Sequence, residues 1–191
     1  FRSGRERYER IHEEIKRIEL LVEDLSRLTK LESPELRIYP EMIKTDELLN
    51  ILKDRFLPLA EERGISLSFE TRVFRLYADR ELIIRGLSNI LLNGIMYSEE
   101  KGTVRCIVTE DTGSKKHLVR VTNPGRIAEN ELPLLFDRLH RGETSRSSPG
   151  SGLGLTITKA IAEAHSGSLT VYNSSDRTVT VDLRLPSSGL Q

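Results

Sequence analysis

The chain has 191 residues, and its 29 Lys and Arg are balanced by 29 Asp and Glu, so the formal net charge is zero. This length suits one ordinary domain with a small helical appendage. The balanced charge argues against a general nucleic-acid binder or membrane-surface binder, since both need a basic excess. The single cysteine, Cys106, excludes a disulfide framework and argues against structural zinc.

The first predicted element is a long helix over residues 5–32, which contain no Gly or Pro. The chain begins with Phe1 rather than Met and shows no signal-peptide pattern, so we expect a piece of a longer protein. Apolar residues recur at steps of three and four, the heptad spacing of a helix that packs on partner helices: Tyr8, Ile11, Ile15, Ile18, Val22 and Leu25. Further leucines widen this stripe and favour a helical bundle, with packing on the chain's own domain as the alternative.

The remaining elements alternate between helix and strand patterns. Ser33-Pro34 ends the long helix, and residues 34–44 form an expected linker. We expect one helix capped by Thr45 and ended by Gly64, a second capped by Asp79, and a third over 152–165. Strands are expected at 65–71, 103–109, 117–122, 168–173 and 178–185. This pattern predicts an α+β fold, a two-layer α/β sandwich with its helices on one face of a sheet.

A glycine-rich turn precedes the third helix, with Gly150, Gly152 and Gly154 at alternate positions. Glycine permits positive φ and close approach of the backbone to a ligand. The following helix start offers free N–H groups and partial positive charge, which suit phosphate. The turn lacks the Lys-Ser/Thr of a P-loop, and no βαβ unit follows it. A simple tight turn therefore remains the alternative for this motif alone.

Two asparagines lie on the second helix at a spacing of four, Asn89 and Asn93. This spacing places both amides on one face, while leucines and isoleucines occupy another. Amides on an otherwise apolar helix need partners. A carboxamide oxygen can ligate Mg²⁺, which in nucleotide sites keeps water and phosphate oxygens as its other ligands. The alternative is that both amides cap neighbouring backbone.

Two further motifs lie between these. A strand breaks into a turn at Val-Thr-Asn-Pro-Gly, residues 121–125, and an Arg-rich segment with a short apolar start spans 135–146. In this order, the four motifs resemble the N, G1, F and G2 boxes of the sensor histidine kinase catalytic domain. That domain belongs to the ATP-binding superfamily of gyrase, Hsp90, histidine kinases and MutL. The resemblance covers roughly residues 5 to 186.

The resemblance implies an ATP-binding domain over 45–187, in which ATP lies between helices and a mobile lid at about 124–151. Asn93 would be the Mg²⁺ ligand, and Asn89 would support the same site one turn earlier. Tyr97 would lie near the nucleotide. Asn123 stands where the family usually has the aspartate that accepts the adenine amino group, and Gly125 would let the backbone pass beneath the base.

The resemblance also implies roles for the lid and the glycine-rich turn. Phe136 would anchor the lid, and Arg141 and Arg146 would reach the phosphates, although these arginines fit a solvated loop equally well. The phosphate-facing hinge would consist of Gly150, Gly152, Leu153 and Gly154.

At the scale of the whole protein, residues 1–33 look like the second helix of a dimerisation and phosphotransfer hairpin. The hairpin helix that carries the acceptor histidine would lie outside this chain. The intact protein would be a homodimer that phosphorylates a histidine with ATP and passes the phosphoryl group to an aspartate on a response-regulator receiver domain. We expect a cytoplasmic region of a bacterial inner-membrane sensor, with no nucleic-acid partner and no membrane contact by this segment.

Three departures from the family pattern bear on activity. Position 123 is Asn rather than Asp, and a neutral amide gives a weaker hydrogen bond than a carboxylate. The G1 segment is one residue shorter than usual, and Met96 replaces a basic residue. These changes leave a degenerate, non-catalytic nucleotide-sensing or docking module as an alternative. Asn89 stands where the superfamily's hydrolases have a water-activating glutamate, and an amide cannot act as that base.

Overall fold

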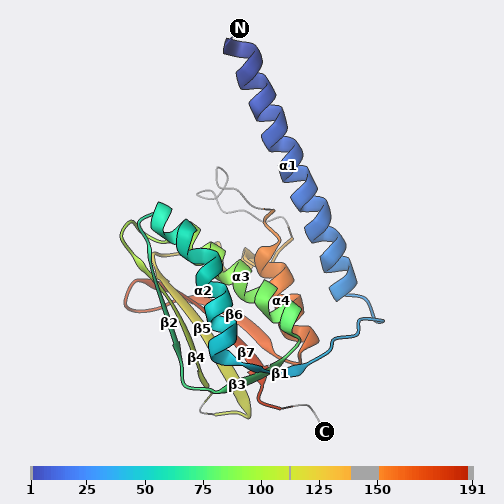
Figure 1. Cartoon of the computed structure of the whole chain (residues 1–191), viewed down its shortest axis with the longest axis vertical. Coiled ribbons are helices and arrows are strands. Elements are labelled where there is room, and N and C mark those ends of the chain that lie inside the picture. The colour runs from blue at the N-terminus through green and yellow to red at the C-terminus, as the bar shows by residue number, and fades with distance from the viewer. Residues whose placement is uncertain (1, 112, 139–150, 189–191) are drawn as a thin grey trace.

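A computed structural model describes residues 2–111, 113–138 and 151–188. A long helix, α1 (Arg2–Leu31), is followed by a body of three α-helices, one 3₁₀ helix and seven strands in these residues (Figure 1). The helices of the body are α2 (Thr45–Glu62), α3 (Arg80–Tyr97), η1 (Leu132–Leu134) and α4 (Gly154–Ala164). The strands are β1 (Glu41–Lys44), β2 (Ser66–Thr71), β3 (Arg75–Ala78), β4 (Thr103–Glu110), β5 (Lys116–Pro124), β6 (Ser168–Asn173) and β7 (Thr178–Pro186).

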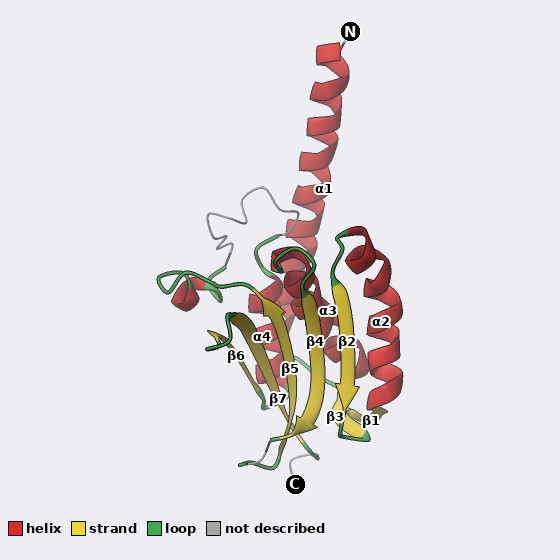
Figure 2. Ribbon diagram, turned by 90° about the vertical axis from the view of Figure 1, so that its left-hand side faces the viewer, coloured by secondary structure: helices red, strands yellow, loops and turns green. Residues whose placement is uncertain are grey.

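Five strands form one sheet in the order β2-β4-β5-β7-β6. The β2–β4 pair is parallel, and the other three pairs are antiparallel. The three α-helices of the body cover one face of this sheet and leave the other uncovered (Figure 2). The predicted α+β fold with helices on one sheet face is therefore confirmed.

The core lies between the sheet and the helices that cover it. In β4 the alternating residues Val104, Cys106 and Val108 are all buried, as their predicted common face requires. Burial raises the pKa of the Cys106 thiol to about 12, so this thiol stays protonated and packs as a small apolar side chain. The sheet and helices thus enclose one continuous apolar core.

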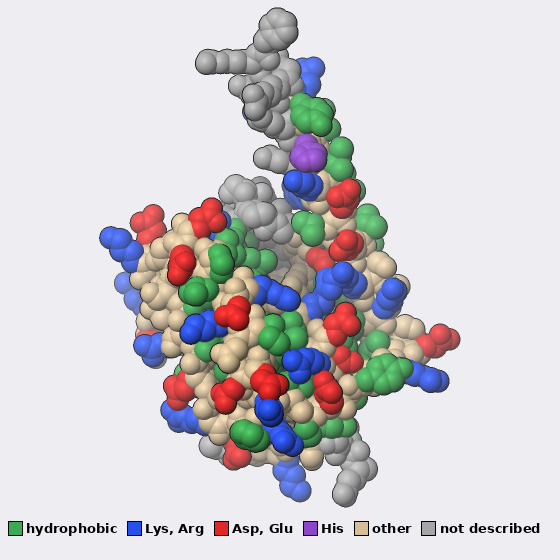
Figure 3. Space-filling view, viewed as in Figure 1, with side chains coloured by type: hydrophobic (Ala, Val, Ile, Leu, Met, Phe, Trp, Pro, Cys, Tyr) green, Lys and Arg blue, Asp and Glu red, His purple; other side chains and the backbone are tan. Residues whose placement is uncertain are grey.

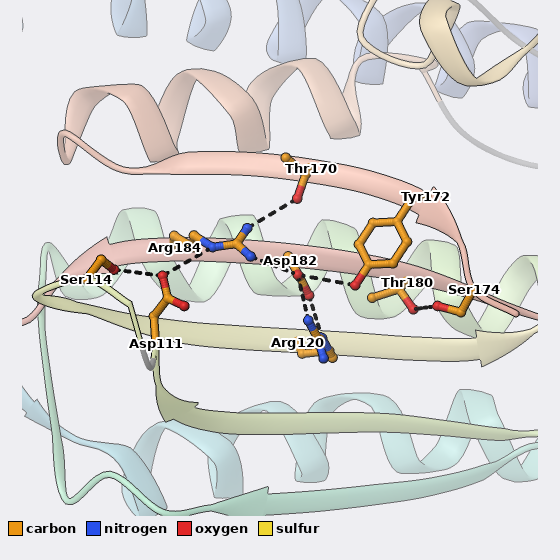
Figure 4. A network of polar contacts seen from close by, with 9 residues as sticks. All are labelled: Asp111, Ser114, Arg120, Thr170, Tyr172, Ser174, Thr180, Asp182 and Arg184. Carbon is orange, nitrogen blue, oxygen red and sulfur yellow. Dashed lines mark hydrogen bonds and ion pairs between the residues drawn. The ribbon is translucent and has the colours of Figure 1, made fainter. Parts of the chain in front are cut away.

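The uncovered face of the sheet carries a network of polar contacts around Asp182 (Figure 4). Arg120 lies opposite Asp182 on the neighbouring strand and donates to it from Nε and Nη2 at 2.7 and 2.8 Å. Arg184 and Tyr172 donate to the same carboxylate at 3.2 and 3.4 Å. Since Asp182 is only 1% exposed and ionic, it needs such donors. The hydrogen bond to Asp182 also raises the pKa of Arg120.

Two short strands depart from the predicted pattern. β1 and β3 pair antiparallel over Glu41–Lys44 and Arg75–Ala78, so the end of the expected linker belongs to a second, two-stranded sheet. This pairing continues up to the first residue of α2, where the Thr45 N–H donates to the Phe74 carbonyl at 3.1 Å. The N-cap of α2 is therefore Lys44 and not Thr45 as predicted, and the buried Thr45 hydroxyl has no hydrogen-bond partner among the described residues.

The other predicted helix ends compare closely with the structure. Asp79 caps α3 as expected, because its Oδ1 accepts from the N–H groups of Glu81 and Leu82 at 3.1 and 3.2 Å. Gly64 follows α2 with a φ of +65°, the conformation of a terminating glycine. The helix predicted from residue 152 begins at Gly154 instead, because Gly152 has a φ of +74°.

The last turns of α1 dock on α4, while the rest of the helix extends away from the body (Figure 1). Leu28 is 1% exposed and packs with Leu153, Ile157 and Ile161. The apolar stripe further towards the N-terminus remains about half exposed or more: Tyr8, Ile11, Ile15, Ile18, Val22 and Leu25. The long helix therefore packs on its own domain at one end only. Among the described residues, no helix is both long enough and apolar enough to cross a membrane.

Candidate nucleotide site

The two asparagines of α3 lie on the side of the helix that approaches α4. The Asn89 side-chain amide donates to the Gly154 carbonyl at 3.0 Å and to the Thr158 hydroxyl at 3.4 Å. This asparagine therefore binds neighbouring backbone, one of the two readings that the sequence left open. The contact links the helix that carries both asparagines directly to the end of the glycine-rich turn.

Asn93, one turn later on the same face, is half-buried and makes no side-chain hydrogen bond with any residue that the structure describes. A half-buried amide without a protein partner leaves its oxygen available to a ligand. An amide oxygen is a suitable ligand for Mg²⁺. The Asn93 side chain thus fits the Mg²⁺-ligand role that the resemblance of the motifs implies.

Asn123, near the end of strand β5, and Gly125, which follows the strand, lie beside the last turn of α3. Asn123 is 5% exposed, and its Nδ2 donates to the Pro124 carbonyl at 3.1 Å. Its Oδ1 accepts no hydrogen bond from the described residues, so it is free to accept one from a ligand. Gly125 has a φ of +139°, and a Cβ there would lie 3.3 Å from the Tyr97 carbonyl oxygen. Both the φ and this close approach favour glycine.

The start of α4 presents free backbone donors. The first N–H bonded within the helix belongs to Ile157, which donates to the Leu153 carbonyl at 2.8 Å. The N–H of Leu153 is capped instead by the Ser151 hydroxyl at 3.2 Å. The N–H groups of residues 154–156 are left unpaired within the helix, as at every helix N-terminus. The Leu153 side chain is buried against α1, so this residue can offer a ligand only its backbone.

Phe136, which lies within the segment expected to form the lid, is held against α4. Its carbonyl accepts a hydrogen bond from the Thr156 hydroxyl at 3.1 Å, and the Lys159 ammonium lies 5.2 Å from the centre of its ring. The ring also packs against the apolar core. Three other residues expected at the site, Arg141, Arg146 and Gly150, lie outside the described residues.

Sequence reasoning missed the role of Thr158. This threonine is fully buried, and its hydroxyl donates to the Gly154 carbonyl at 2.7 Å and lies 3.4 Å from the Gly86 carbonyl. It therefore holds the start of α4 against α3 at the point where Asn89 binds. A threonine four positions after Gly154, among the apolar residues of the buried face of this helix, was the available signal.

The end of α1 and the residue that follows it, Glu32, contact the body on either side of residues 139–150, which lie outside the described residues. Arg138 donates to both carboxylate oxygens of Glu32 at 2.7 Å. Ser151 donates to Asp24 at 2.6 Å. Neither contact was predicted, because nothing in the local sequence pattern indicates which acidic residues near the end of the long helix meet the body.

Residues 78–189, more than half of the chain, match the family model of histidine kinase-, DNA gyrase B- and HSP90-like ATPases. The chain is 36% identical over 166 residues to the sensor histidine kinase CusS of Escherichia coli, a match that covers 83% of this chain and 33% of that protein. It is 34% identical over 160 residues to the sensor histidine kinase HprS of Escherichia coli K12, covering 84% of this chain and 35% of that one. The chain thus spans about a third of the length of these relatives.

Solved structures show the same fold. The catalytic domain of histidine kinase ThkA superposes with a TM-score of 0.69 at 25% identity, covering 78% of this chain and 97% of that one. The Acinetobacter baumannii histidine kinase AdeS superposes with a TM-score of 0.77 at 20% identity, covering 95% and 84% respectively. The chain therefore belongs to the family of histidine kinase-, DNA gyrase B- and HSP90-like ATPases, as the ATPase domain of a sensor histidine kinase.

Proposed function

We propose that this region binds Mg-ATP and transfers the γ-phosphoryl group to a histidine on a helical hairpin, for relay to a response-regulator aspartate. The observation that carries the proposal is the pair of asparagines on α3. Asn89 holds the end of the glycine-rich turn, and Asn93 keeps its amide free on the same face. A ligand that lies along this face meets amide oxygens, the free N–H groups of α4 and the end of β5.

The site recognises the base and the phosphates with different groups. The free Oδ1 of Asn123 accepts a hydrogen bond from the adenine amino group, and Gly125 leaves room for the base beside the backbone. The unpaired N–H groups at the start of α4 bind phosphate oxygens, since a helix N-terminus carries donors and partial positive charge. Phe136 holds the base of the lid against α4.

Asn93 is the residue that would hold Mg²⁺, which neutralises charge on the transferring phosphate when it is bound. Neither asparagine of α3 can take a proton from water, because an amide is not a general base. The site therefore favours transfer to a protein group over hydrolysis. Catalysis rests on positioning and on stabilising charge in the transition state.

A transfer assay tests the proposal. The chain is mixed with Mg-ATP and a separate helical hairpin that carries an acceptor histidine, and labelled phosphate on the hairpin is measured. Asn93→Ala should abolish transfer, whereas Asn50→Ala, an exposed asparagine on α2, should leave it unchanged. Equal transfer by Asn93→Ala and the unsubstituted chain would contradict the site assignment. Steady phosphate release without the hairpin would instead indicate a hydrolase.

The proposed partners follow from the surface of α1 and from the relatives. Figure 3 shows hydrophobic side chains at the surface of α1, and in the intact protein the exposed apolar stripe of this helix would pack in a homodimeric bundle. ThkA, which resembles this chain at 24% identity with a TM-score of 0.72, is known in complex with the response regulator TrrA. A receiver domain is the corresponding partner proposed here. Use of ATP places the region on the cytoplasmic side of a membrane-bound sensor.

A further inference from the structure

Arg85 on α3 carries a guanidinium group with little protein bonding for its degree of burial. Its side chain is 30% exposed, and its ion pair with Asp24 of α1 spans 3.3 Å from Nη2 to Oδ1. Its Nε is buried and has no hydrogen-bond partner among the described residues. A guanidinium has five N–H donors, and a buried donor without an acceptor costs free energy. Among the described residues, the ion pair with Asp24 occupies only one of the Arg85 N–H groups, so the others remain available to another anion.

The position of Arg85 relates it to the nucleotide site. It precedes Asn89 by four residues and Asn93 by eight, so the three side chains share one face of α3. With a rise of 1.5 Å per residue, Arg85 lies about 6 Å and about 12 Å along the axis from these asparagines. An arginine side chain can reach across the nearer of these distances.

The glycine-rich turn meets Arg85 through a shared acceptor. Asp24 pairs with Arg85 through Oδ1 and accepts from the Ser151 hydroxyl through Oδ2 at 2.6 Å. Ser151 in turn caps the Leu153 N–H just before α4. The guanidinium therefore lies where the asparagine face of α3, the glycine-rich turn and the docked helix α1 come together.

We propose that Arg85 binds the phosphoryl group that is transferred, and that Asp24 holds the guanidinium away from it while α1 is docked. The inference rests on the function proposed above. In that reaction the lone pair of the acceptor imidazole nitrogen forms a bond to the γ-phosphorus. The bond to the β–γ bridging oxygen breaks, and its electron pair leaves with ADP. The imidazole loses its proton to solvent. Arg85 donates to the equatorial oxygens, where charge is concentrated in the transition state.

The first test separates catalysis from docking. Transfer to an acceptor hairpin is measured for Arg85→Gln, Arg85→Lys and the control Arg55→Gln, whose arginine also bonds to α3, at Ser88. Arg85→Gln should lower kcat by about tenfold or more with little change in KM for Mg-ATP, because the lost contact forms in the transition state. Arg85→Lys should recover part of this loss, and Arg55→Gln should match the unsubstituted chain.

A merely structural role for Arg85 predicts a different result. The melting temperature without nucleotide would then fall for Arg85→Gln while kcat stayed unchanged, and this would overturn the proposal. If the unsubstituted chain transfers no phosphate at all, the proposed function fails. If the unsubstituted chain and the Arg85→Gln variant transfer phosphate at the same rate, the proposed function stands and only the assignment of Arg85 fails.

A double-mutant cycle tests the role of Asp24. Asp24→Asn should raise the transfer rate about two- to fivefold, because it weakens the contact that competes for the guanidinium. The same substitution in the Arg85→Gln background should have no effect. If Asp24→Asn still raises the transfer rate in the Arg85→Gln background, Asp24 acts through Ser151. If Asp24→Asn does not raise the transfer rate of the otherwise unsubstituted chain, Asp24 does not restrain Arg85. Either result overturns the role given to Asp24. Glu23→Gln, on the exposed side of α1, is the matched control.

Discussion

Asn123 ends β5 with a neutral amide at the position where the adenine amino group is expected. Its Nδ2 is held by the Pro124 carbonyl, so Oδ1 is left as the acceptor. The amide oxygen can thus accept a hydrogen bond from the base as an aspartate oxygen would, but it does not carry the charge of a carboxylate. In the proposed site, we therefore expect this residue to determine the strength of nucleotide binding more than the choice of base.

Replacing Asn123 by Asp should strengthen binding of Mg-ATP by about three- to tenfold, because hydrogen bonds to a charged acceptor are roughly twice as strong as neutral ones. Calorimetric titration measures the change. The gain should be absent for inosine triphosphate, which lacks the amino group. An equal gain for both nucleotides would show that position 123 does not bind the base.

His117 on β5 makes part of the fold's stability depend on pH. It is 7% exposed, its Nδ1 has no hydrogen-bond partner within the part of the chain that the structure describes, and burial lowers its pKa against a smaller opposing effect of Glu110. The unfolded chain therefore binds a proton at this histidine at a higher pH than the folded chain does. Stability falls as the pH drops below the ordinary histidine value of about 6.5, and above that value the histidine makes no pH-dependent contribution.

The free energy of unfolding should fall less for His117→Leu than for the unsubstituted chain when the pH is lowered from about 7.5 to about 5.5. This interval spans the ordinary pKa of histidine. Urea unfolding at several pH values measures this difference. The same slope for His117→Leu as for the unsubstituted chain would contradict the effect of burial.

At the scale of elements, the end of α1 behaves as part of the body. Leu28 is buried against α4, Asp24 meets Arg85 and Ser151, and Glu32 meets Arg138. These contacts hold the end of α1 and the residue that follows it against Arg85, Arg138 and Ser151 of the body.

Leu28→Ala should weaken this docking by about 2–3 kcal/mol, in the lower range for a buried leucine. Hydrogen exchange should then be faster in the last two turns of α1, while strands β5 and β7 keep their protection. Leu25→Ala, an exposed leucine on the same helix, is the control. Unchanged exchange at the end of α1 would mean that Leu28 does not hold the helix.

Local sequence patterns were sufficient to predict most of these elements. The Asp79 cap, the alternation of Val104, Cys106 and Val108 and the glycine after α2 depend on residues near in sequence, so they could be identified. The pairing of β1 with β3 could not, because each strand has four residues and depends on a partner more than thirty residues away. The same holds for Thr45, whose buried position follows from that pairing.

At the scale of the whole molecule, the order of four motifs along the chain indicated a single site, and the fold brings the described parts of those motifs to one end of the sheet and its helices. What the sequence left open was the partner of each amide. Asn89 and Asn93 look equivalent in the pattern, yet the Asn89 amide binds Gly154, whereas the Asn93 side chain makes no hydrogen bond with the described residues. That difference arises from the packing of α4 on α3, a tertiary effect that no spacing rule contains.

We propose that Asn93, Asn123 and the start of α4 form one nucleotide site, and an NMR titration of the chain with Mg-ATP measures this. We expect shifts in the side-chain amides of Asn93 and Asn123 and in the backbone amides of residues 152–156, with little change around Asp182 on the uncovered sheet face. No shift at millimolar nucleotide, or shifts confined to other parts of the chain, would show that these residues do not form a nucleotide site.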